Sequence, residues 1–326
     1  MLATPPPGSW LDPKPAGAAP ALVVGTMNFG KRTPADESVR IVHAALERGL
    51  TWFDSANVYC NGESERLLGR ALAGRRGLAR IATKVGIGKL SGPPEGLKAA
   101  RVVAALDESL ARLGTDHIDL YYLHPPDPKT PFDETLAVLE AARQAGKIGA
   151  WGVSNFASWQ VGDLLHLCAA HGWSRPRVSQ VVYNLLIRQL DLEYFAFAKA
   201  HQVHTTVYNP LAGGLLAGKG LDGKLEPGSR FEQNAMYRKR YLSDRFAELA
   251  RAYAALAADA GLTSVQLAYA WTAQRPGVDS ILLGPATLEQ LDAGIEGCAR
   301  KLPAGVAQKA DELHRAYLGT EHVYAR

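Results

Sequence analysis

The chain has 326 residues, of which 47% are hydrophobic and 21% are charged, and its formal net charge is +4. This composition is ordinary for a globular protein, and the length allows one large core or two smaller ones. No block of Lys and Arg resembles a nucleic-acid-binding arm, and no apolar run reaches the about 18 residues of a membrane span. We therefore expect neither a nucleic-acid partner nor a membrane partner.

The three cysteines are odd in number, widely spaced and without metal-ligand spacing. This pattern is typical of a protein from a reducing compartment that holds no metal. The first residues lack the basic start and apolar run of a signal peptide. The sequence thus predicts a soluble, cytoplasmic protein.

Strand-like and helix-like segments alternate after a Pro- and Ala-rich lead-in over residues 1–20, which we expect to be loose. The predicted strands cover residues 21–27, 51–56, 80–85, 118–124, 148–155, 178–184, 204–211 and 280–285. The predicted helices cover residues 35–49, 63–74, 98–113, 132–146, 157–171, 191–201, 243–260 and 263–274, with one more from about 287.

Eight strand–helix repeats in one chain predict an α/β fold, a closed (β/α)8 TIM barrel formed by a single domain over residues 21–326. The strands read as continuous apolar runs, as expected for a parallel sheet that is covered on both sides. A doubly wound open sheet is the structural alternative. No G-x-G-x-x-G motif follows the first strand, however, so the usual dinucleotide signature of that open fold is missing.

Polar residues follow most of these strands, at the end where such barrels build their active sites. Any one of them has a structural interpretation, for example as a helix cap. Polar ends on six strands are harder to explain in that way. The residues are Asp54, Lys84, His124, Ser154, Asn155, Gln180, Tyr208 and Asn209.

The first group of these residues is consistent with proton delivery. Tyr59 follows Asp54 by five residues, in a loop that could fold back over the barrel mouth. A free tyrosine titrates near pH ~10, so we expect an adjacent Lys84 ammonium to stabilise the phenolate and lower its pKa. Asp54 would pair with Lys84, because a lone buried charge is costly. His124 would donate a hydrogen bond to a substrate oxygen, whereas a packing aromatic is the alternative for Tyr59.

The second group suits a nucleotide cofactor. Ser154, Asn155 and Gln180 offer hydrogen-bond partners for a carboxamide, and Tyr208 offers a flat face for an aromatic ring. Glycines within residues 211–219 let backbone N–H groups approach a pyrophosphate, although such a loop is often only a flexible connection. Further candidates for holding phosphate, by charge or at the start of the last helix, are Lys219, Arg230, Gly284, Thr287 and Gln290.

The same motifs, in this order, resemble the aldo-keto reductases over roughly residues 20–326. The supporting stretches are GVSNF (152–156), QVVYN (180–184) and YNPLAGGLL (208–216). The resemblance implies a barrel that binds NADP(H) across its C-terminal mouth and reduces an aldehyde or ketone. It also implies catalytic roles. Tyr59 would be the general acid, and Lys84 would lower the pKa of Tyr59. Asp54 would pair with Lys84, and His124 would orient the carbonyl group.

The resemblance implies cofactor contacts as well. Ser154, Asn155 and Gln180 would hold the nicotinamide carboxamide, and Tyr208 would stack on its ring. The remaining implied contacts are Thr26, Asn209, Leu211, Gly213, Leu215 and Gly218.

Within that superfamily the chain is most similar to the aflatoxin-aldehyde and succinic-semialdehyde reductase branch, through GTMNFGKR (25–32) and residues 234–241. By this similarity Arg230 would contact the 2′-phosphate of the cofactor, and Tyr237, Arg240 and Arg326 would line the substrate pocket. Two arginines there favour aldehydes that carry a carboxylate, such as succinic semialdehyde. A solvated basic face is the alternative for Arg240. Dimers are common in this branch, so a homodimer is also expected, although no sequence feature marks an interface.

Some positions depart from the family pattern. Gly294 stands where an Asn usually touches the adenine side, and Pro285 and Ala286 replace residues that often assist the phosphate site. These changes bear on the preference for NADPH over NADH. Asn57 and Cys60 flank the catalytic loop without an assigned role. An alternative function is an NADP(H)-binding sensor with little turnover, resembling the barrel subunits of potassium channels.

Overall fold

The computed structural model of the protein describes residues 9–88, 95–221, 229–232 and 234–320. Eight parallel strands form one closed barrel in chain order, and the last strand pairs with the first. The predicted (β/α)8 barrel is therefore confirmed. The strands are β1 (Ala21–Gly25), β2 (Trp52–Asp54), β3 (Arg80–Val85), β4 (Ile118–Leu123), β5 (Ile148–Ser154), β6 (Val178–Val182), β7 (His204–Tyr208) and β8 (Ser280–Leu283).

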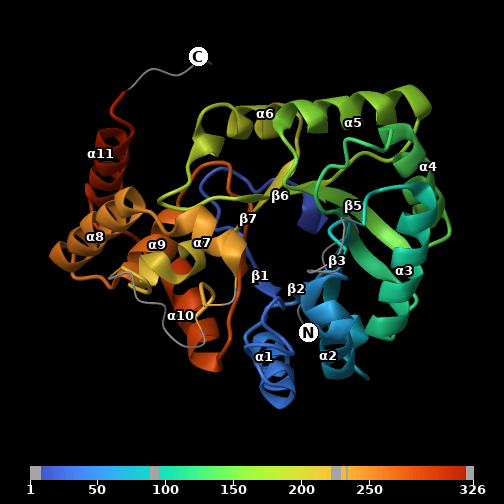
Figure 1. The fold of residues 1–326 in the computed structure, drawn as a ribbon, viewed down its shortest axis with the longest axis horizontal. Coiled ribbons are helices and arrows are strands. Elements are labelled where there is room, and N and C mark those ends of the chain that lie inside the picture. The colour runs from blue at the N-terminus through green and yellow to red at the C-terminus, as the bar shows by residue number, and fades with distance from the viewer. Residues whose placement is uncertain (1–8, 89–94, 222–228, 233, 321–326) are drawn as a thin grey trace.

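Helices surround the barrel as a ring, seen in Figure 1 with the strands at the centre. No helix within the described ranges is long and apolar enough to cross a membrane. The helices are α1 (Ala35–Glu47), α2 (Glu63–Ala71), α3 (Ala99–Leu113), α4 (Phe132–Gln144), α5 (Ser158–His171), α6 (Tyr194–Ala200), α7 (Ala235–Tyr241), α8 (Asp244–Asp259), α9 (Ser264–Ala273), α10 (Leu288–Ala299) and α11 (Val306–Leu318).

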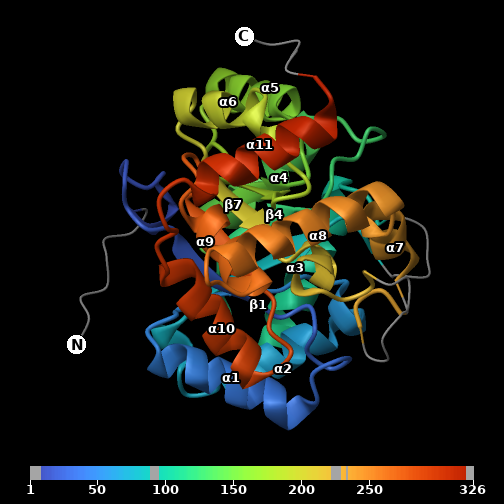
Figure 2. The ribbon, with the colours of Figure 1, turned by 90° about the vertical axis from the view of Figure 1, so that its left-hand side faces the viewer.

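Two of these helices were not predicted as separate elements. The short α7 falls within a stretch that reads as irregular, and the structure caps it with the Asn234 side chain, which accepts a hydrogen bond from the Tyr237 N–H (3.2 Å). Seven residues are too few for a periodic apolar pattern to be recognised. The other helix, α11, packs along α8, as Figure 2 shows.

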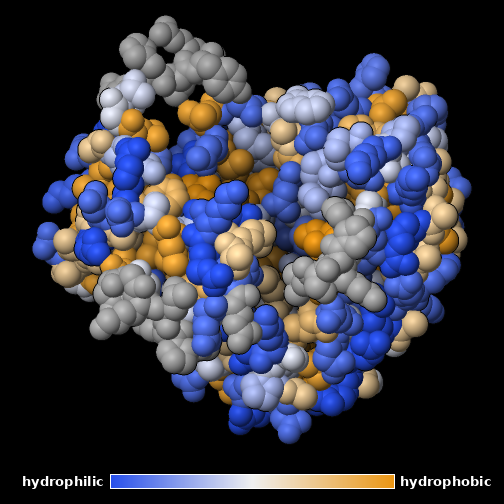
Figure 3. Space-filling model, in the orientation of Figure 1, coloured by the Kyte–Doolittle hydropathy of each residue, from blue (hydrophilic) through white to orange (hydrophobic). Residues whose placement is uncertain are grey.

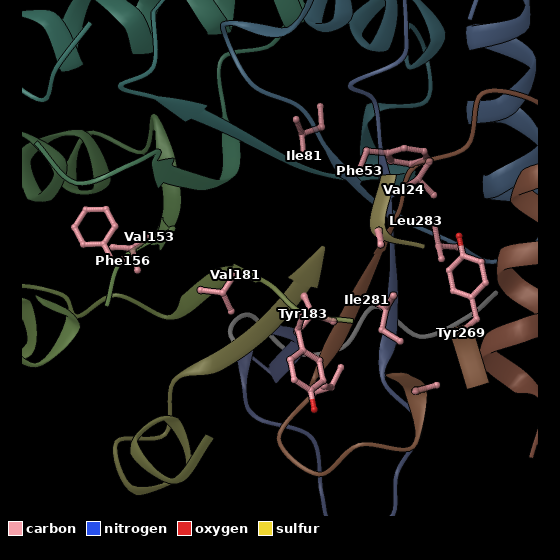
Figure 4. Close-up of a cluster of buried hydrophobic side chains, with 14 of the residues drawn as sticks. Val24, Phe53, Ile81, Val153, Phe156, Val181, Tyr183, Tyr269, Ile281 and Leu283 are labelled. Carbon is pink, nitrogen blue, oxygen red and sulfur yellow. The ribbon is translucent and has the colours of Figure 1, made fainter. Parts of the chain in front are cut away.

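The strands divide their side chains between two cores, as the alternation of a β-strand requires. Side chains that point away from the barrel axis pack under the helices, and Figure 4 shows Val24, Phe53, Ile81 and Ile281 in this layer. A smaller apolar cluster fills the barrel interior, with Trp52, Ala82, Leu120, Tyr122 and Val178 among its members. The catalytic candidates Asp54 and Lys84 follow two positions after Trp52 and Ala82 respectively. They therefore face the interior as well, nearer the carboxyl ends of their strands.

The lead-in is more ordered than expected from residue 9 onward, while residues 1–8 lie outside the described part of the chain. A short 3₁₀ helix, η1 (Ser9–Leu11), places Leu11 in the inner core, and the Trp10 ring packs edge-on against Trp52 with 4.6 Å between centroids. The Lys14 N–H donates to the Asp279 carboxylate (2.8 Å). This segment therefore closes the amino-terminal end of the barrel. Composition alone does not reveal this role, because the contacts are with residues far away in the chain.

Candidate active site

A buried ion pair lies at the centre of the site. The Lys84 ammonium donates a hydrogen bond to Oδ1 of Asp54, and neither side chain has more than 1% of its surface exposed. The same ammonium donates to the carbonyl of Ser55 (2.6 Å), and the Gln180 amide donates to Oδ2 of Asp54 (2.8 Å). Two charges removed from water are costly unless each is paired and hydrogen-bonded, and here both conditions hold. The structure thus brings Asp54 and Lys84 together, as the sequence predicted.

Tyr59 and His124 complete the group. The Lys84 ammonium lies 5.1 Å from the centre of the Tyr59 ring and 5.7 Å from the centre of the Tyr122 ring. The rings of Tyr59 and His124 meet edge-on with 6.4 Å between their centroids. The predicted phenol, ammonium, carboxylate and imidazole therefore converge at the carboxyl end of β2, β3 and β4.

The pKa of Tyr59 differs from the expectation. Burial of the phenol, reinforced by the negative charge of Asp54, raises the pKa of Tyr59 well above its usual value. The net shift of the Tyr59 pKa is therefore upward, opposite to the expected lowering, because burial and the charge of Asp54 outweigh the nearby positive charge. Burial, together with the nearby positive charge of Lys84, lowers the pKa of His124 well below its usual value. At neutral pH the site thus holds a protonated phenol and a neutral imidazole.

The backbone after Tyr59 turns sharply. Cys60, Asn61 and Gly62 all have left-handed conformations, with φ of 49°, 54° and 87°. For residues with a side chain such a conformation costs about 1–2 kcal/mol each. A Cβ at Gly62 would also lie 2.6 Å from the Arg112 side chain. The turn folds the loop back, which presents Tyr59 to the barrel mouth.

A second row of polar groups follows β5 and β7. The Nδ2 amide of Asn155 donates to the Ser154 hydroxyl (3.0 Å), and the Tyr208 hydroxyl donates to Oδ1 of the Asn155 side chain (2.6 Å). Burial raises the pKa of Tyr208 to about 12, although the neighbouring Arg240 opposes that shift. The structure therefore groups Ser154, Asn155 and Tyr208, whereas Gln180 is bonded to Asp54.

A cavity of about 280 Å³ lies between the loop after β7 and the start of α10. On the face shown in Figure 3 the surface is hollowed near the middle, with apolar side chains deep in the hollow. The predicted cofactor residues that line the cavity are Asn209, Leu211, Gly213, Lys219, Arg230, Gly284 and Gln290. A larger cavity of about 940 Å³ lies beside residues 13–20, and its lining includes none of the predicted site residues.

The remaining cofactor candidates lie outside this lining. Thr26 is fully buried, and its hydroxyl bonds to Ser64 (2.7 Å) and to the Asp54 carbonyl (3.2 Å). Leu215 is buried in the short 3₁₀ segment η5 (Ala212–Ala217), and Gly218 ends that segment with φ of 89°. Thr287 caps α10 by accepting a hydrogen bond from the Gln290 N–H (3.3 Å).

The cavity wall concentrates positive charge. Arg230 donates to the side-chain oxygens of Asn209 (3.2 Å) and Asn28 (3.3 Å), and Asn28 in turn donates to the Gly284 carbonyl (3.0 Å). Arg32 also lines the cavity, and its pKa is lowered by burial and by the charge of Arg230. Two guanidinium groups that repel each other in this way are suited to an anion between them. Neither Asn28 nor Arg32 was predicted as a site residue, although both lie within the GTMNFGKR stretch over residues 25–32.

The predicted substrate residues are only partly described. Tyr237 on α7 is 4% exposed, and the Arg240 guanidinium lies 5.9 Å from the centre of its ring. Arg240 also lies beside Tyr208, and these contacts raise the pKa of Arg240 against the opposing effect of burial. Arg326 lies outside the described residues.

The residues present suit a nicotinamide dinucleotide. Two buried polar atoms at the mouth, Nδ1 of His124 and Nδ2 of Asn209, have no hydrogen-bond partner among the described residues. Gly213 and Gly214 line the cavity with φ of 72° and 116°, a region that favours glycine, and a Cβ at Gly213 would lie 2.9 Å from the Tyr237 ring. The positive charges and the unpartnered polar atoms are groups that can bind a dinucleotide. A group of acid, histidine or cysteine side chains able to hold a metal does not occur in the described part of the chain.

A parallel α/β barrel with a buried acid–base group beside a cationic cavity defines the class: a nucleotide-dependent oxidoreductase of the barrel type. The aldo/keto reductase family model matches residues 21–315, so the chain belongs to the aldo/keto reductase family. It is 37% identical to mouse aflatoxin B1 aldehyde reductase member 2, over 90% of this chain and 83% of the relative. It is also 37% identical to human aldo-keto reductase family 7 member A3, over 85% and 88%.

The chain is also similar to a protein that is named as a channel subunit and not as a reductase. The chain is 30% identical to a probable voltage-gated potassium channel subunit beta of Arabidopsis thaliana, over 83% of this chain and 84% of the relative. Membership in the aldo/keto reductase family identifies the chain as an oxidoreductase that uses a nicotinamide cofactor. Family membership alone does not identify the substrate.

Proposed function

We propose that the protein reduces aldehydes to alcohols with NADPH. The observation that carries this proposal is the convergence of Tyr59 and His124 on the buried Asp54–Lys84 pair, at the same barrel mouth as the cationic cavity. The names of the relatives, aflatoxin B1 aldehyde reductase among them, support an aldehyde as the substrate. A reduced nicotinamide bound in the cavity would supply the hydride.

Tyr59 supplies the proton in this proposal. Its raised pKa keeps the phenol protonated at neutral pH, so the hydroxyl is ready to donate to the carbonyl oxygen as negative charge develops there. An ammonium has three N–H groups, and Lys84 uses two of them on Asp54 and Ser55. The third stabilises the phenolate that Tyr59 becomes. Lys84 therefore acts during proton transfer rather than by lowering the resting pKa.

His124 orients the carbonyl group. The lowered pKa of His124 makes its ring neutral, so one nitrogen carries a hydrogen and can donate to the substrate oxygen. A neutral donor leaves Tyr59 as the group that transfers the proton. The edge-on packing holds the His124 ring beside the Tyr59 ring, so both donors belong to one part of the mouth.

Arg230 and Arg32 favour NADPH over NADH. Both line the cavity, and the charge of Arg230 already lowers the pKa of Arg32. A 2′-phosphate between the two guanidinium groups would remove this repulsion and gain charge-assisted hydrogen bonds. NADH has no such phosphate. A preference for NADPH follows from this difference.

Arg240 suits a carboxylated aldehyde. It lies beside Tyr208 and Tyr237, close to the groups assigned to the nicotinamide and the substrate. Together with the predicted role of Arg326, this placement favours a short aldehyde that ends in a carboxylate, such as succinic semialdehyde. The homodimer and the cytoplasmic location stay predictions.

Turnover with a simple aldehyde tests the proposal. We expect the wild-type protein to consume NADPH in the presence of 4-nitrobenzaldehyde, followed by absorbance at 340 nm. Tyr59→Phe should lower kcat by about 100-fold to 10,000-fold, the usual contribution of acid–base catalysis, and should still bind NADPH. Equal rates for the two proteins would remove Tyr59 from the mechanism.

A cofactor-sensing subunit is the second candidate, favoured by the similarity to the potassium channel subunit beta of Arabidopsis. It predicts NADPH binding with little turnover for any aldehyde. The same assay therefore separates the two functions, provided that NADPH binding is measured in parallel by protein fluorescence.

A further inference from the structure

The loop that carries Tyr59 is held along β3 as an extension of the barrel sheet. The Ser55 N–H donates to the Ala82 carbonyl (2.8 Å), and the Asn57 N–H donates to the Lys84 carbonyl (3.2 Å). Asn57 lies only two residues before Tyr59. The backbone of the loop thus follows the strand that carries the catalytic lysine.

A carboxylate ties this loop to the end of the strand. Oδ and Nδ of Asn57 face different surroundings: Oδ1 is buried without a partner among the described residues, while Nδ2 donates to Oε2 of Glu95 (2.9 Å). The same Glu95 oxygen accepts the Gly86 N–H (3.1 Å). Because Gly86 comes two residues after Lys84, Glu95 connects the segments that hold the two catalytic groups.

Glu95 is itself fixed in place. Its side chain is 7% exposed, and its other oxygen, Oε1, accepts a hydrogen bond from Nε of Arg101 (2.5 Å). The two remaining nitrogens of Arg101 donate to Glu108 (2.8 and 2.9 Å). Every hydrogen bond to the Glu95 carboxylate named here comes from an N–H donor. An amide in its place would turn its own NH₂ against one of those donors, so only a carboxylate accepts them all.

We propose that Glu95, acting through Asn57, is a positioning residue that sets the Tyr59 phenol at the right distance from the Lys84 ammonium. This inference rests on the proposed function. The left-handed turn over residues 60–62 lies on the other side of Tyr59 and is conformationally strained. The contact on the near side of Tyr59 therefore determines where the loop settles. Proton transfer is sensitive to such placement, because small displacements of a reacting group have large effects on rate.

Three variants and one matched control test the inference. Asn57→Ala removes the contact from the loop, Glu95→Ala removes it from the carboxylate, and the double variant removes both groups. The control is Asp127→Ala. Asp127 accepts the Leu97 N–H (2.9 Å) and so holds the same β3–α3 connection, without a contact to the Tyr59 loop among those described.

We expect Asn57→Ala and Glu95→Ala each to lower kcat about 10-fold to 100-fold, with the Kd for NADPH changed less than twofold. The double variant should be no slower than the slower single variant, because both changes break one contact. Asp127→Ala should keep kcat within twofold of the wild type. Equal losses in the control, or additive losses in the double variant, would mean general damage and would overturn the inference.

Hydrogen exchange of the ligand-free proteins gives a readout that does not depend on activity. Peptides over residues 55–62 should exchange faster in Asn57→Ala and Glu95→Ala than in the wild type, and at the wild-type rate in Asp127→Ala. Unchanged exchange in the first two variants overturns the inference, whatever their rates. If the wild type itself fails to turn over any aldehyde, the proposed function fails, and the exchange data show separately whether the Glu95 contact fixes the loop. Faster exchange together with a wild-type kcat would also count against positioning.

Discussion

The two sides of the barrel mouth differ in how their charges are satisfied. At β2 to β4, each charge of the Asp54–Lys84 pair is buried and meets an opposite charge. At β7 and β8, Arg230 donates to the neutral side chains of Asn209 and Asn28, and burial together with the positive charge of Arg230 lowers the pKa of Arg32 on the same cavity wall. The catalytic side is therefore assembled without a ligand, whereas the cofactor side is arranged to gain stability when an anion arrives.

This difference separates two kinds of mutational effect. Changes on the catalytic side should lower stability and kcat, because they leave a buried charge alone. Changes on the cofactor side should mainly alter affinity, because the charge-assisted contacts they remove are made with the ligand, while Arg230 holds only neutral side chains inside the protein.

The largest effect is expected for Lys84→Met. The variant leaves Asp54 buried without its cation, which should lower the free energy of unfolding by about 3–5 kcal/mol and kcat by at least about 100-fold. Guanidinium chloride unfolding and steady-state kinetics measure both. Lys147→Met is the matched control, because Lys147 pairs with Asp107 at the surface and its loss should change neither quantity appreciably. A Lys84→Met protein of wild-type stability would show that buried Asp54 does not depend on Lys84 for charge compensation.

A smaller effect is expected for Arg230→Met, and it should be limited to the affinity for the cofactor. The KM for NADPH should rise about 10-fold to 100-fold, the range of a hydrogen bond to a charged group, while the KM for NADH stays nearly constant. Arg238→Met serves as control, because Arg238 donates to the carbonyls of Phe231 and Glu232 and does not line the cavity. An equal rise for both cofactors would place the 2′-phosphate elsewhere.

A modest effect on substrate choice is expected for Arg240→Met. The KM for succinic semialdehyde should rise about threefold to fivefold, as for a partly exposed charge pair, and the KM for 4-nitrobenzaldehyde should stay the same. Parallel changes for the two aldehydes would count against a carboxylate contact at Arg240.

The smallest effect is expected for pH: the kcat for reduction should not change with pH near neutrality. The pKa of His124 is lowered, so the folded protein keeps this ring neutral at pH values where an exposed histidine would take up a proton. The pKa of Tyr59 is raised, so the phenol keeps its proton at alkaline pH. Neither group changes its charge between about pH 6 and 9. The kcat for reduction should therefore be flat over this interval, and an inflection near pH 6.5 that disappears in His124→Gln would be the opposite result.

Much of the fold could be predicted from the sequence because the repeats carry strong local signals. The strand β3 and the helices α8 and α9 lie within one residue of their predicted bounds. Asp54 and Lys84 could be paired in advance, because both follow apolar strands whose ends meet at one mouth.

Other features depend on contacts between distant parts of the chain. The hydrogen bond from Gln180 to Asp54 spans 126 residues, and nothing local indicates that the amide would face the catalytic carboxylate. Leu11 enters the inner core from a segment whose composition is typical of a loose terminus. The pKa of Tyr59 in the folded protein could not be predicted either, because it depends on how deeply the phenol is buried and on the nearby charge of Asp54.

A crystal structure of the complex with NADP⁺ tests the contrast between the two sides most directly. We expect the side chains of Asp54, Tyr59, Lys84 and His124 to move by less than about 1 Å from their positions without ligand. Arg230 should turn onto the 2′-phosphate, and C4 of the nicotinamide should lie at the mouth so that a carbonyl carbon fits about 3–3.5 Å away, beside the Tyr59 hydroxyl. A catalytic group that comes together only in the complex, or a phosphate bound away from Arg230, would contradict the account.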